Sequence, residues 1–159
     1  AADAYVCRDM RNLDGLGQYD AICCCCDSFN YLLDRQEILS FFQEVWKHLT
    51  PGGWFFFDTH STDRLDEFRE EWNETGTFPD GCDYQWSIRS EDDWIYQDFA
   101  FYRDGQTIQE HHIQRVYDPQ WLADCFTDLA SEMHIVTDFH TEGIQPGEKI
   151  FYQIKRRKI

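Results

Sequence analysis

Polar and acidic side chains follow directly after three short apolar stretches of this sequence. They are Asp9 and Met10, then Asp27, Ser28, Asn30 and Tyr31, then Asp58, Thr59 and His60. If the apolar stretches are parallel strands, their carboxyl ends lie at the edge of the sheet where ligands bind in open α/β folds. A carboxylate there can accept hydrogen bonds from a hydroxyl or an exocyclic amine. Such an acid is equally common as a helix cap or a turn residue.

A second chemical signal lies later in the chain, where Glu110 precedes His111 and His112. A histidine near a carboxylate can act as a general base toward an amine or a hydroxyl. Adjacent residues on a strand point to opposite faces, so one of the two histidines can face a cleft. Ordinary surface placement of both is the alternative.

The elements around the first acids have a βαβ pattern. Tyr19–Cys26 is uniformly apolar after its first two residues, which predicts a strand covered on both faces. Asp34 and Glu37 have the spacing of a capping box, and apolar residues then recur at helical spacing for about four turns. The turn Thr50–Gly53 ends this helix, and Trp54–Asp58 predicts the next strand.

After residue 61 the pattern changes. The segment 62–82 is polar, with a helix predicted around Asp63–Trp72, and a period of two begins at Tyr84. With the hairpin signal Asp104-Gly105, this period predicts a separate antiparallel meander that ends at Val116. The remaining predicted elements are a helix opened by Asp118-Pro119 and two mutually antiparallel strands, Met133–Phe139 and Lys149–Lys155.

Several of these motifs occur together in one family. They are Cys7–Arg11, Tyr19–Ile22, Asp27–Leu32, Leu49–Gly53 with Phe57-Asp58, and Glu110–His112 with Arg115 and Tyr117. In combination they resemble the small-molecule branch of the class I S-adenosylmethionine-dependent methyltransferases. The resemblance implies an α/β fold: a Rossmann-like methyltransferase sheet (its C-terminal portion, strands three to seven) with an inserted antiparallel β-meander. It divides the chain into 1–61, the central part of the α/β domain, 62–117, a lid or substrate meander, and 118–159, a helix and hairpin that return to that domain.

The resemblance also implies roles for individual residues. Asp9 would accept the adenine amine, the Met10 backbone would meet a ring nitrogen, and Asp27 would lie near the methionine portion of S-adenosylmethionine, with Asn30 and Tyr31 closing the cleft. The cofactor-binding candidates are Asp9, Met10, Asp27, Ser28 and Asn30, and the catalytic candidates are Tyr31, His60 and His112. The implied partner is a small-molecule methyl acceptor.

The sequence departs from the family at its start. Family members begin with a strand and a glycine-rich G-x-G-x-G turn, whereas Gly15 and Gly17 here follow no adequate strand and precede no helix. We therefore expect a fragment of a longer polypeptide, or else a degenerate relative that does not bind the cofactor alone. Without the first strands, Ile22–Cys26 would be an exposed apolar edge that invites self-association. A non-catalytic binding or regulatory module is the competing function, and a nucleotide-binding oxidoreductase is disfavoured because its glycine fingerprint is also missing.

Composition narrows the classes of partner. The 159 residues form one domain with a formal charge of −16, which disfavours nucleic acid. The longest apolar stretch, Ala21–Cys26, is too short to span a membrane. Seven cysteines without paired spacing fit free thiols in a reducing cytoplasm. The consecutive Cys23–Cys26 cannot converge on one ion from an extended strand, so no metal site is predicted.

Overall fold

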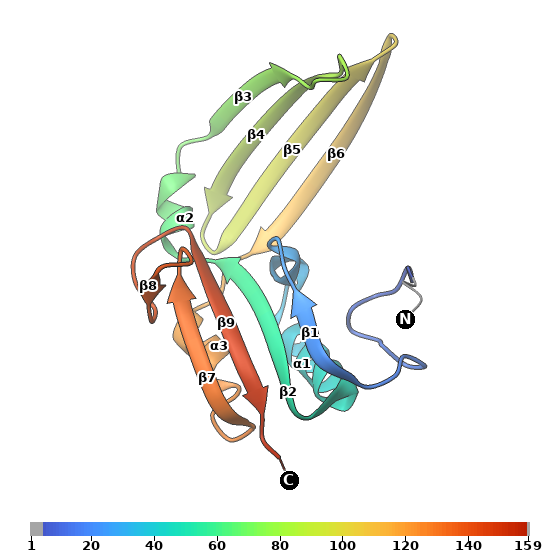
Figure 1. The fold of residues 1–159 in the computed structure, drawn as a ribbon. Helices are drawn as coiled ribbons and strands as arrows, with labels where there is room; N and C mark the ends of the chain where they lie inside the picture. The colour runs from blue at the N-terminus through green and yellow to red at the C-terminus, as the bar shows by residue number, and fades with distance from the viewer. Residues whose placement is uncertain (1–4, 159) are drawn as a thin grey trace.

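A five-stranded sheet forms the base of the molecule in the computed structural model, which describes residues 5–158. Its strand order is β1-β2-β9-β7-β8, and β1 (Tyr19–Cys24) runs parallel to β2 (Leu49–His60). The later strands β7 (Ala130–Thr137), β8 (Thr141–Glu142) and β9 (Lys149–Arg156) pair antiparallel to their neighbours. The carboxyl ends of β1 and β2 point toward a second sheet (Figure 1).

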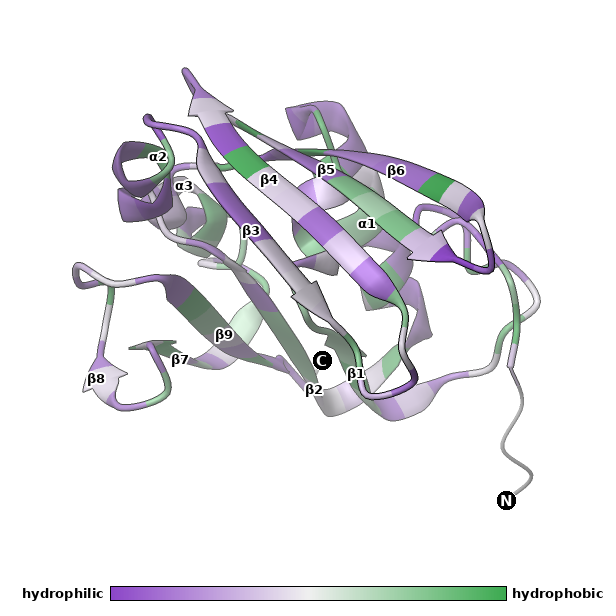
Figure 2. Ribbon diagram, turned by 90° about the horizontal axis from the view of Figure 1, so that it is seen from above, coloured by the Kyte–Doolittle hydropathy of each residue, from purple (hydrophilic) through white to green (hydrophobic). Residues whose placement is uncertain are grey.

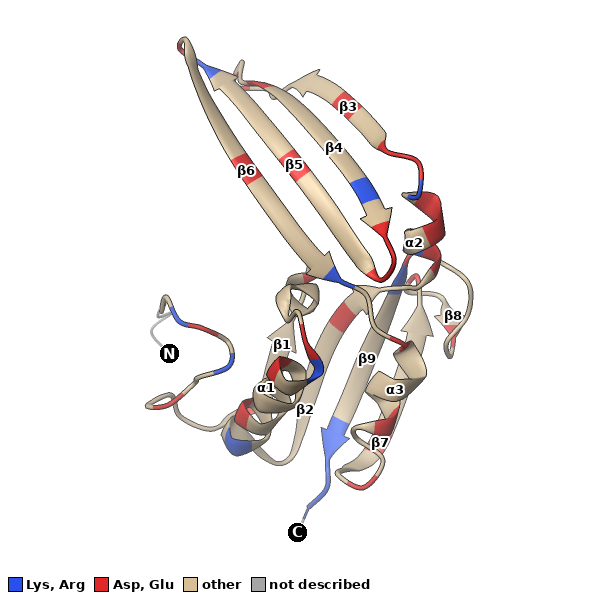
Figure 3. Cartoon of the chain, turned by 180° about the vertical axis from the view of Figure 1, so that it is seen from behind, with Lys and Arg blue, Asp and Glu red and all other residues tan. Residues whose placement is uncertain are grey.

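Two helices cover one face of this main sheet (Figure 3). The first, α1 (Arg35–His48), begins where Asp34 Oδ1 accepts a 2.8 Å hydrogen bond from the Glu37 backbone N–H, as the capping signal predicts. The second, α3 (Pro119–Asp124), is capped in the same way by Asp118, which accepts from the Trp121 N–H at 2.7 Å. No helix of residues 5–158 lies on the opposite face (Figure 1).

The core lies between the sheet and these helices. It is built on aromatic side chains that are at most 2% exposed, among them Phe29, Phe55, Phe57, Phe126 and Tyr152. The rings of Phe57 and Tyr152 stack from neighbouring strands, with centroids 4.4 Å apart. Burying side chains of this size stabilises the fold by about 1.5–3 kcal/mol each. Phe29 belongs to the short helix η1 (Ser28–Tyr31), so core packing also fixes the segment that carries the candidate site.

The second sheet has four antiparallel strands, β3 (Trp72–Thr77), β4 (Asp83–Glu91), β5 (Trp94–Arg103) and β6 (Gln106–Arg115). It follows the short helix α2 (Asp63–Glu67). Positive φ at both Asp104 and Gly105 gives the two-residue turn that the sequence predicts between β5 and β6. Strand β6 is largely hydrophilic, as Figure 2 shows, which is consistent with its position at the sheet edge.

The structure corrects four expectations about the elements. Tyr5–Cys7, the first of the three apolar stretches and the one expected as a strand before Asp9, forms no strand, and Tyr5 is fully exposed. Strand β1 is therefore the sheet edge, as the missing neighbour predicts. It is not covered on both faces, since Cys23 is exposed on the side where no helix packs. Cys25 and Cys26 lie beyond the end of the strand and are exposed as well. Trp72 lies in β3 and not in a helix, so the meander has one strand more than predicted.

No helix within residues 5–158 has the length and apolar composition needed to cross a membrane.

Candidate functional site

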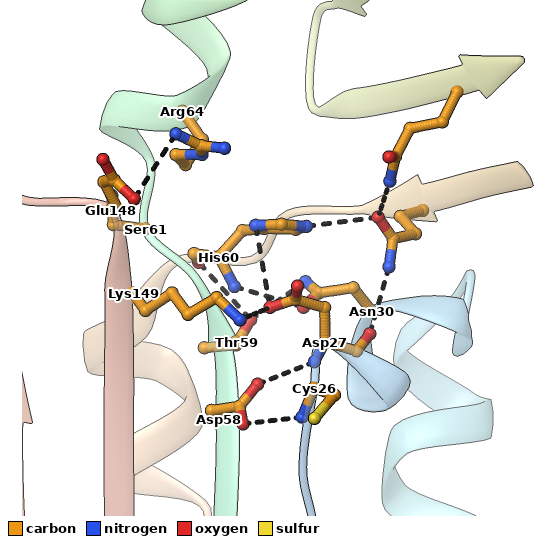
Figure 4. Close-up of polar contacts among 12 residues, drawn as sticks. Cys26, Asp27, Asn30, Asp58, Thr59, His60, Ser61, Arg64, Glu148 and Lys149 are labelled. Atoms are coloured by element: carbon orange, nitrogen blue, oxygen red, sulfur yellow. Dashed lines mark hydrogen bonds and ion pairs between the residues drawn. The ribbon is translucent and has the colours of Figure 1, made fainter. Parts of the chain in front are cut away.

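The turn after β1 is held by a carboxylate from β2. Asp58, only 5% exposed, accepts hydrogen bonds from the backbone N–H groups of Cys26 and Asp27, each at 2.8 Å (Figure 4). Both turn residues have positive φ, 61° and 57°. A left-handed conformation costs an ordinary residue about 1–2 kcal/mol. The two bonds to a charged acceptor offset this cost, so Asp58 fixes the position of Asp27.

The Asp27 side chain lies between a lysine and a histidine (Figure 4). Lys149 Nζ is 2.8 Å from Asp27 Oδ1, and His60 Nδ1 is 3.9 Å from the same oxygen. The contact with Lys149 is an ion pair without the angles of a hydrogen bond, and Oδ1 is buried with no hydrogen bond from the described residues. Burial acts to lower the pKa of Lys149, but the contact with Asp27 outweighs it and raises that pKa. Lys149 is therefore charged at neutral pH.

His60 is 4% exposed and takes part in a chain of amides. Its Nε2 lies 3.1 Å from Gln114 Oε1, which also accepts a hydrogen bond from Gln97 Nε2 at 2.8 Å. Gln114 Nε2 in turn donates to the Asp27 carbonyl oxygen at 3.1 Å. Because the Gln114 oxygen only accepts, Nε2 of His60 carries the proton and Nδ1 is the unprotonated atom that faces Asp27. Burial lowers the pKa of His60, against the attraction of Asp27, so the ring is neutral at pH 7.

Asn30 is completely buried and uses its whole side chain within the protein. Its Nδ2 donates to Thr59 Oγ1 at 2.9 Å and to the Arg115 carbonyl oxygen at 2.8 Å. Its Oδ1 accepts a hydrogen bond from the His60 backbone N–H at 3.1 Å. Asn30 thus ties η1 to β2 and to the end of β6. In this arrangement Asn30 and the buried His60 hold the elements of the site together, and the cofactor contact of Asn30 stays a prediction.

Tyr31 and His112 meet at a cavity of about 290 Å³ between η1 and the second sheet. The Tyr31 hydroxyl is 2.7 Å from His112 Nδ1, and His112 Nε2 is 3.3 Å from Glu110 Oε2. Burial, together with the negative charges of Asp27 and Glu110, raises the pKa of Tyr31. Tyr31 therefore donates its proton in the hydrogen bond to His112. This chain of two titratable groups ends in a carboxylate and can relay a proton.

A larger cavity of about 820 Å³ lies on the helix-free side of the main sheet. Asp58 and Lys149 contribute polar groups to it, and Phe56 and Phe151 contribute aromatic walls. Cys26 lines this cavity and the smaller one as well. The turn after β1 is therefore the place where the two cavities meet.

The first cofactor candidates lie apart from this group, in the segment before β1 (Figure 1). Asp9 accepts hydrogen bonds from the Arg11 backbone N–H and Nε, both at 2.9 Å, and these bonds lower the pKa of Asp9 to about 2. Met10 packs partly buried against the main core. Ser28 is half-buried at the start of η1, next to Asp27. The structure thus brings Asp27, Ser28, Tyr31 and His112 toward one site but not Asp9.

Sequence reasoning missed Lys149, Gln97 and Gln114. Each lies in a strand far along the chain from Asp27, and no motif marks any of them. The one available signal is weak: Lys149 directly precedes the short apolar run Ile150–Tyr152.

Comparison with known sequences finds related proteins, although no protein-family model matches the chain. It is 30% identical over 163 residues to a protein of Bacillus subtilis (strain 168) named "Putative methyltransferase YqeM", and the match covers 95% of this chain and 64% of that protein. A protein of Geobacillus sp. (strain WCH70) with the same designation is 28% identical, with 94% of this chain and 64% of the relative covered. The chain thus spans less than two-thirds of the length of these relatives.

Solved structures give the same result. An S-adenosylmethionine-dependent methyltransferase from Clostridium acetobutylicum ATCC 824 matches with a TM-score of 0.79 and 28% identity, over 96% of this chain and 64% of the other. CalS10, an amino pentose methyltransferase from Micromonospora echinaspora solved with S-adenosylmethionine bound, shares the fold with a TM-score of 0.67 at 14% identity, over 94% of this chain and 63% of the other. In sequence the chain is thus similar to proteins named putative methyltransferases, and in fold it is similar to S-adenosylmethionine-dependent methyltransferases.

Proposed function

We propose that this chain is part of an S-adenosylmethionine-dependent methyltransferase that acts on a small-molecule acceptor. The observation that carries the proposal is the junction of the two cavities at Cys26, beside the turn that Asp58 holds. Methyl transfer is an in-line displacement, so holding donor and acceptor close on opposite sides supplies much of the rate enhancement. Two cavities that share one wall provide a place for each.

The larger cavity fits the cofactor in charge and shape. S-adenosylmethionine supplies a methyl group on a positively charged sulfur. The carboxylates of Asp58, Asp138 and Glu148 line the cavity and outnumber Lys149, the one cation among the described lining residues. Phe56 and Phe151 offer apolar walls. Asp27 and Ser28 would bind the methionine portion, and Asp9 would exchange Arg11 for the adenine amine, with the Met10 backbone beside the ring.

The smaller cavity favours a protonatable amine as the acceptor. Its lining includes the carboxylates of Asp27 and Glu110 and the rings of Phe99 and Phe101, with no Lys or Arg among the described residues. A carboxylate-lined aromatic site attracts a cationic or amine-bearing ligand. The amino pentose acceptor named for the structural neighbour CalS10 agrees with this choice. As the nitrogen–methyl bond forms and the sulfur–methyl bond breaks, the nitrogen loses a proton, which His112 is placed to accept with help from Tyr31.

We further propose that the active protein contains additional chain. The helix-free face of the main sheet carries Phe56 and Phe151, and Phe139 beside them is 80% exposed. An exposed apolar face and an unpaired edge strand are unfavourable in water. An additional segment that covers this face and pairs with β1 would also supply the missing part of the cofactor site. Self-association through β1 is the competing use of the same edge.

Calorimetric titration with S-adenosylmethionine tests this function on the 159-residue chain and on a version extended to the length of its relatives. The 159-residue chain should bind weakly or not at all, and the extended protein should bind at micromolar concentration. In the extended protein Asp27→Ala and Asp9→Ala should weaken binding. His112→Ala should leave binding unchanged and lower turnover about 100-fold or more, the usual contribution of a general base.

Three results contradict the proposal. Micromolar binding by the 159-residue chain alone would show that its cofactor site is complete. No binding by the extended protein would favour a non-catalytic module. Unchanged turnover in His112→Ala would show that the proton relay through His112 takes no part in the reaction.

A further inference from the structure

Three side chains with metal-binding groups gather where the segment before β1 crosses the end of α1, away from the cavities described above. Asp14, Glu44 and His48 each offer one ligand atom, and these atoms lie within 4.8 Å of one another. Glu44 and His48 are one turn apart on α1, so they share a face of the helix. Both are nearly buried, at 7% and 8% exposed, while Asp14 is exposed.

The second observation is the orientation of the His48 ring. Its Nδ1 lies 2.9 Å from the Gly17 carbonyl oxygen, which only accepts, so Nδ1 carries the proton. Nε2 then presents a lone pair, and the nearest carboxylate oxygen, Glu44 Oε2, is 3.9 Å away. Within residues 5–158 no hydrogen-bond donor reaches Nε2. A carbonyl that fixes one ring nitrogen and leaves the other free is the usual arrangement behind a metal-binding histidine.

The surrounding charges also leave room for a cation. Lys47, three positions further along α1, contacts Glu44 Oε1. Lys47 is 61% exposed at its side chain and can move into water. The described residues form no ion pair with Asp14. Two carboxylates and an imidazole thus face Lys47, while Arg8 donates a hydrogen bond to the Asp14 carbonyl oxygen beside them.

We propose that Asp14, Glu44 and His48 bind a divalent cation. A set of one nitrogen and two carboxylate ligands suits Mn²⁺ or Zn²⁺, with water in the remaining positions. Small movements of the exposed Asp14 would close the set around one ion. The Leu13 backbone N–H already donates to Glu44 Oε2 at 3.0 Å, so the ion would strengthen an existing contact. Its effect would be to fix the segment before β1, which carries Asp9 and Met10, against α1.

Mn²⁺ is the probe of choice for the 159-residue chain. Cys23, Cys25 and Cys26 are exposed and would bind Zn²⁺, whereas Mn²⁺ prefers oxygen and nitrogen ligands. Loss of the free Mn²⁺ signal in electron paramagnetic resonance should show one ion bound per chain at micromolar concentration. His48→Gln and Asp14→Asn should each weaken binding tenfold or more. Asp14→Asn changes an exposed side chain, so it tests the site even where His48→Gln disturbs folding.

The matched control is His134→Gln, because His134 also lies beside an acid, with Nε2 2.9 Å from Glu132 Oε1 on an exposed strand. This variant should bind Mn²⁺ like the parent chain. The proposal is overturned if no Mn²⁺ binds below millimolar concentration, or if Asp14→Asn and His134→Gln bind it equally well.

Discussion

Replacing Asp58 with alanine should be among the most destabilising single changes in the main sheet. The carboxylate accepts two backbone hydrogen bonds at 2.8 Å in a place where Asp58 is 5% exposed. A hydrogen bond to a charged group contributes about 1.5–3 kcal/mol, so the pair contributes about 3–6 kcal/mol. Cys26 is exposed, and water can reach its N–H after the change. We therefore expect Asp58→Ala to lower the free energy of unfolding by about 3–5 kcal/mol.

The assay is urea unfolding followed by the fluorescence of the six tryptophans. The matched control is Asp138→Ala, because Asp138 Oδ1 also accepts from two consecutive N–H groups, those of Glu148 at 3.0 Å and Lys149 at 2.9 Å, but in a partly exposed turn. Water can replace that acceptor, so about 1 kcal/mol should be lost. Amide exchange of Asp27 should accelerate in Asp58→Ala only. Equal losses in the two variants, or a loss below about 1 kcal/mol for Asp58→Ala, would refute the reasoning.

Three further predictions concern stability. Because burial lowers the pKa of His60 below its ordinary value of 6.5, the native state binds fewer protons than the unfolded state. The stability that His60 contributes should be complete above about pH 6.5 and should fall as the pH decreases toward the folded pKa, by up to about 1.4 kcal/mol per pH unit. In urea unfolding between pH 7 and pH 5, the free energy of unfolding of His60→Gln should change less with pH than that of the parent chain. An equal pH dependence in the two proteins would contradict this prediction. Gly53→Ala should lower the free energy of unfolding by about 1–3 kcal/mol, because the added Cβ would lie 2.9 Å from the Asp20 carbonyl oxygen. The control Gly17→Ala, with open space around it, should change the urea midpoint little. Equal midpoints in the two variants would be evidence against the close approach of β1 and β2. Asp34→Ala should cost about 0.5–2 kcal/mol in thermal unfolding through loss of the α1 cap, and no change would mean that Glu37 N–H finds another acceptor.

Elements with a local signal could be predicted from the sequence. The cap at Asp34 and the apolar spacing after it predict α1, and the structure confirms the helix over Arg35–His48. The Asp104-Gly105 turn predicts the β5–β6 hairpin, because few residue pairs adopt positive φ at both positions. These features depend on neighbours within a few residues, so the chain encodes them directly.

The errors arose where a distant part of the molecule decides the outcome. Cys23–Cys26 has the composition of a strand covered on both faces, but whether a second face is covered depends on which other elements pack there. Trp72 follows a helical segment, yet its backbone pairs with Ile88 in β4. Pairing between strands competes with local preference and here prevails over it.

For the candidate site, the sequence by itself determined which acids and histidines lie at or just beyond the carboxyl ends of the strands, namely Asp27, Asp58 and His60. The pattern of apolar residues predicts where a strand ends, because that pattern reflects which residues of the strand are buried. Only the tertiary structure decided what those groups do. It pairs Asp27 with Lys149, which is 122 positions later in the chain, and it buries His60 against Gln114 from the second sheet. Ionisation and tautomer depend on burial and on such distant partners, and no local pattern specifies either of them.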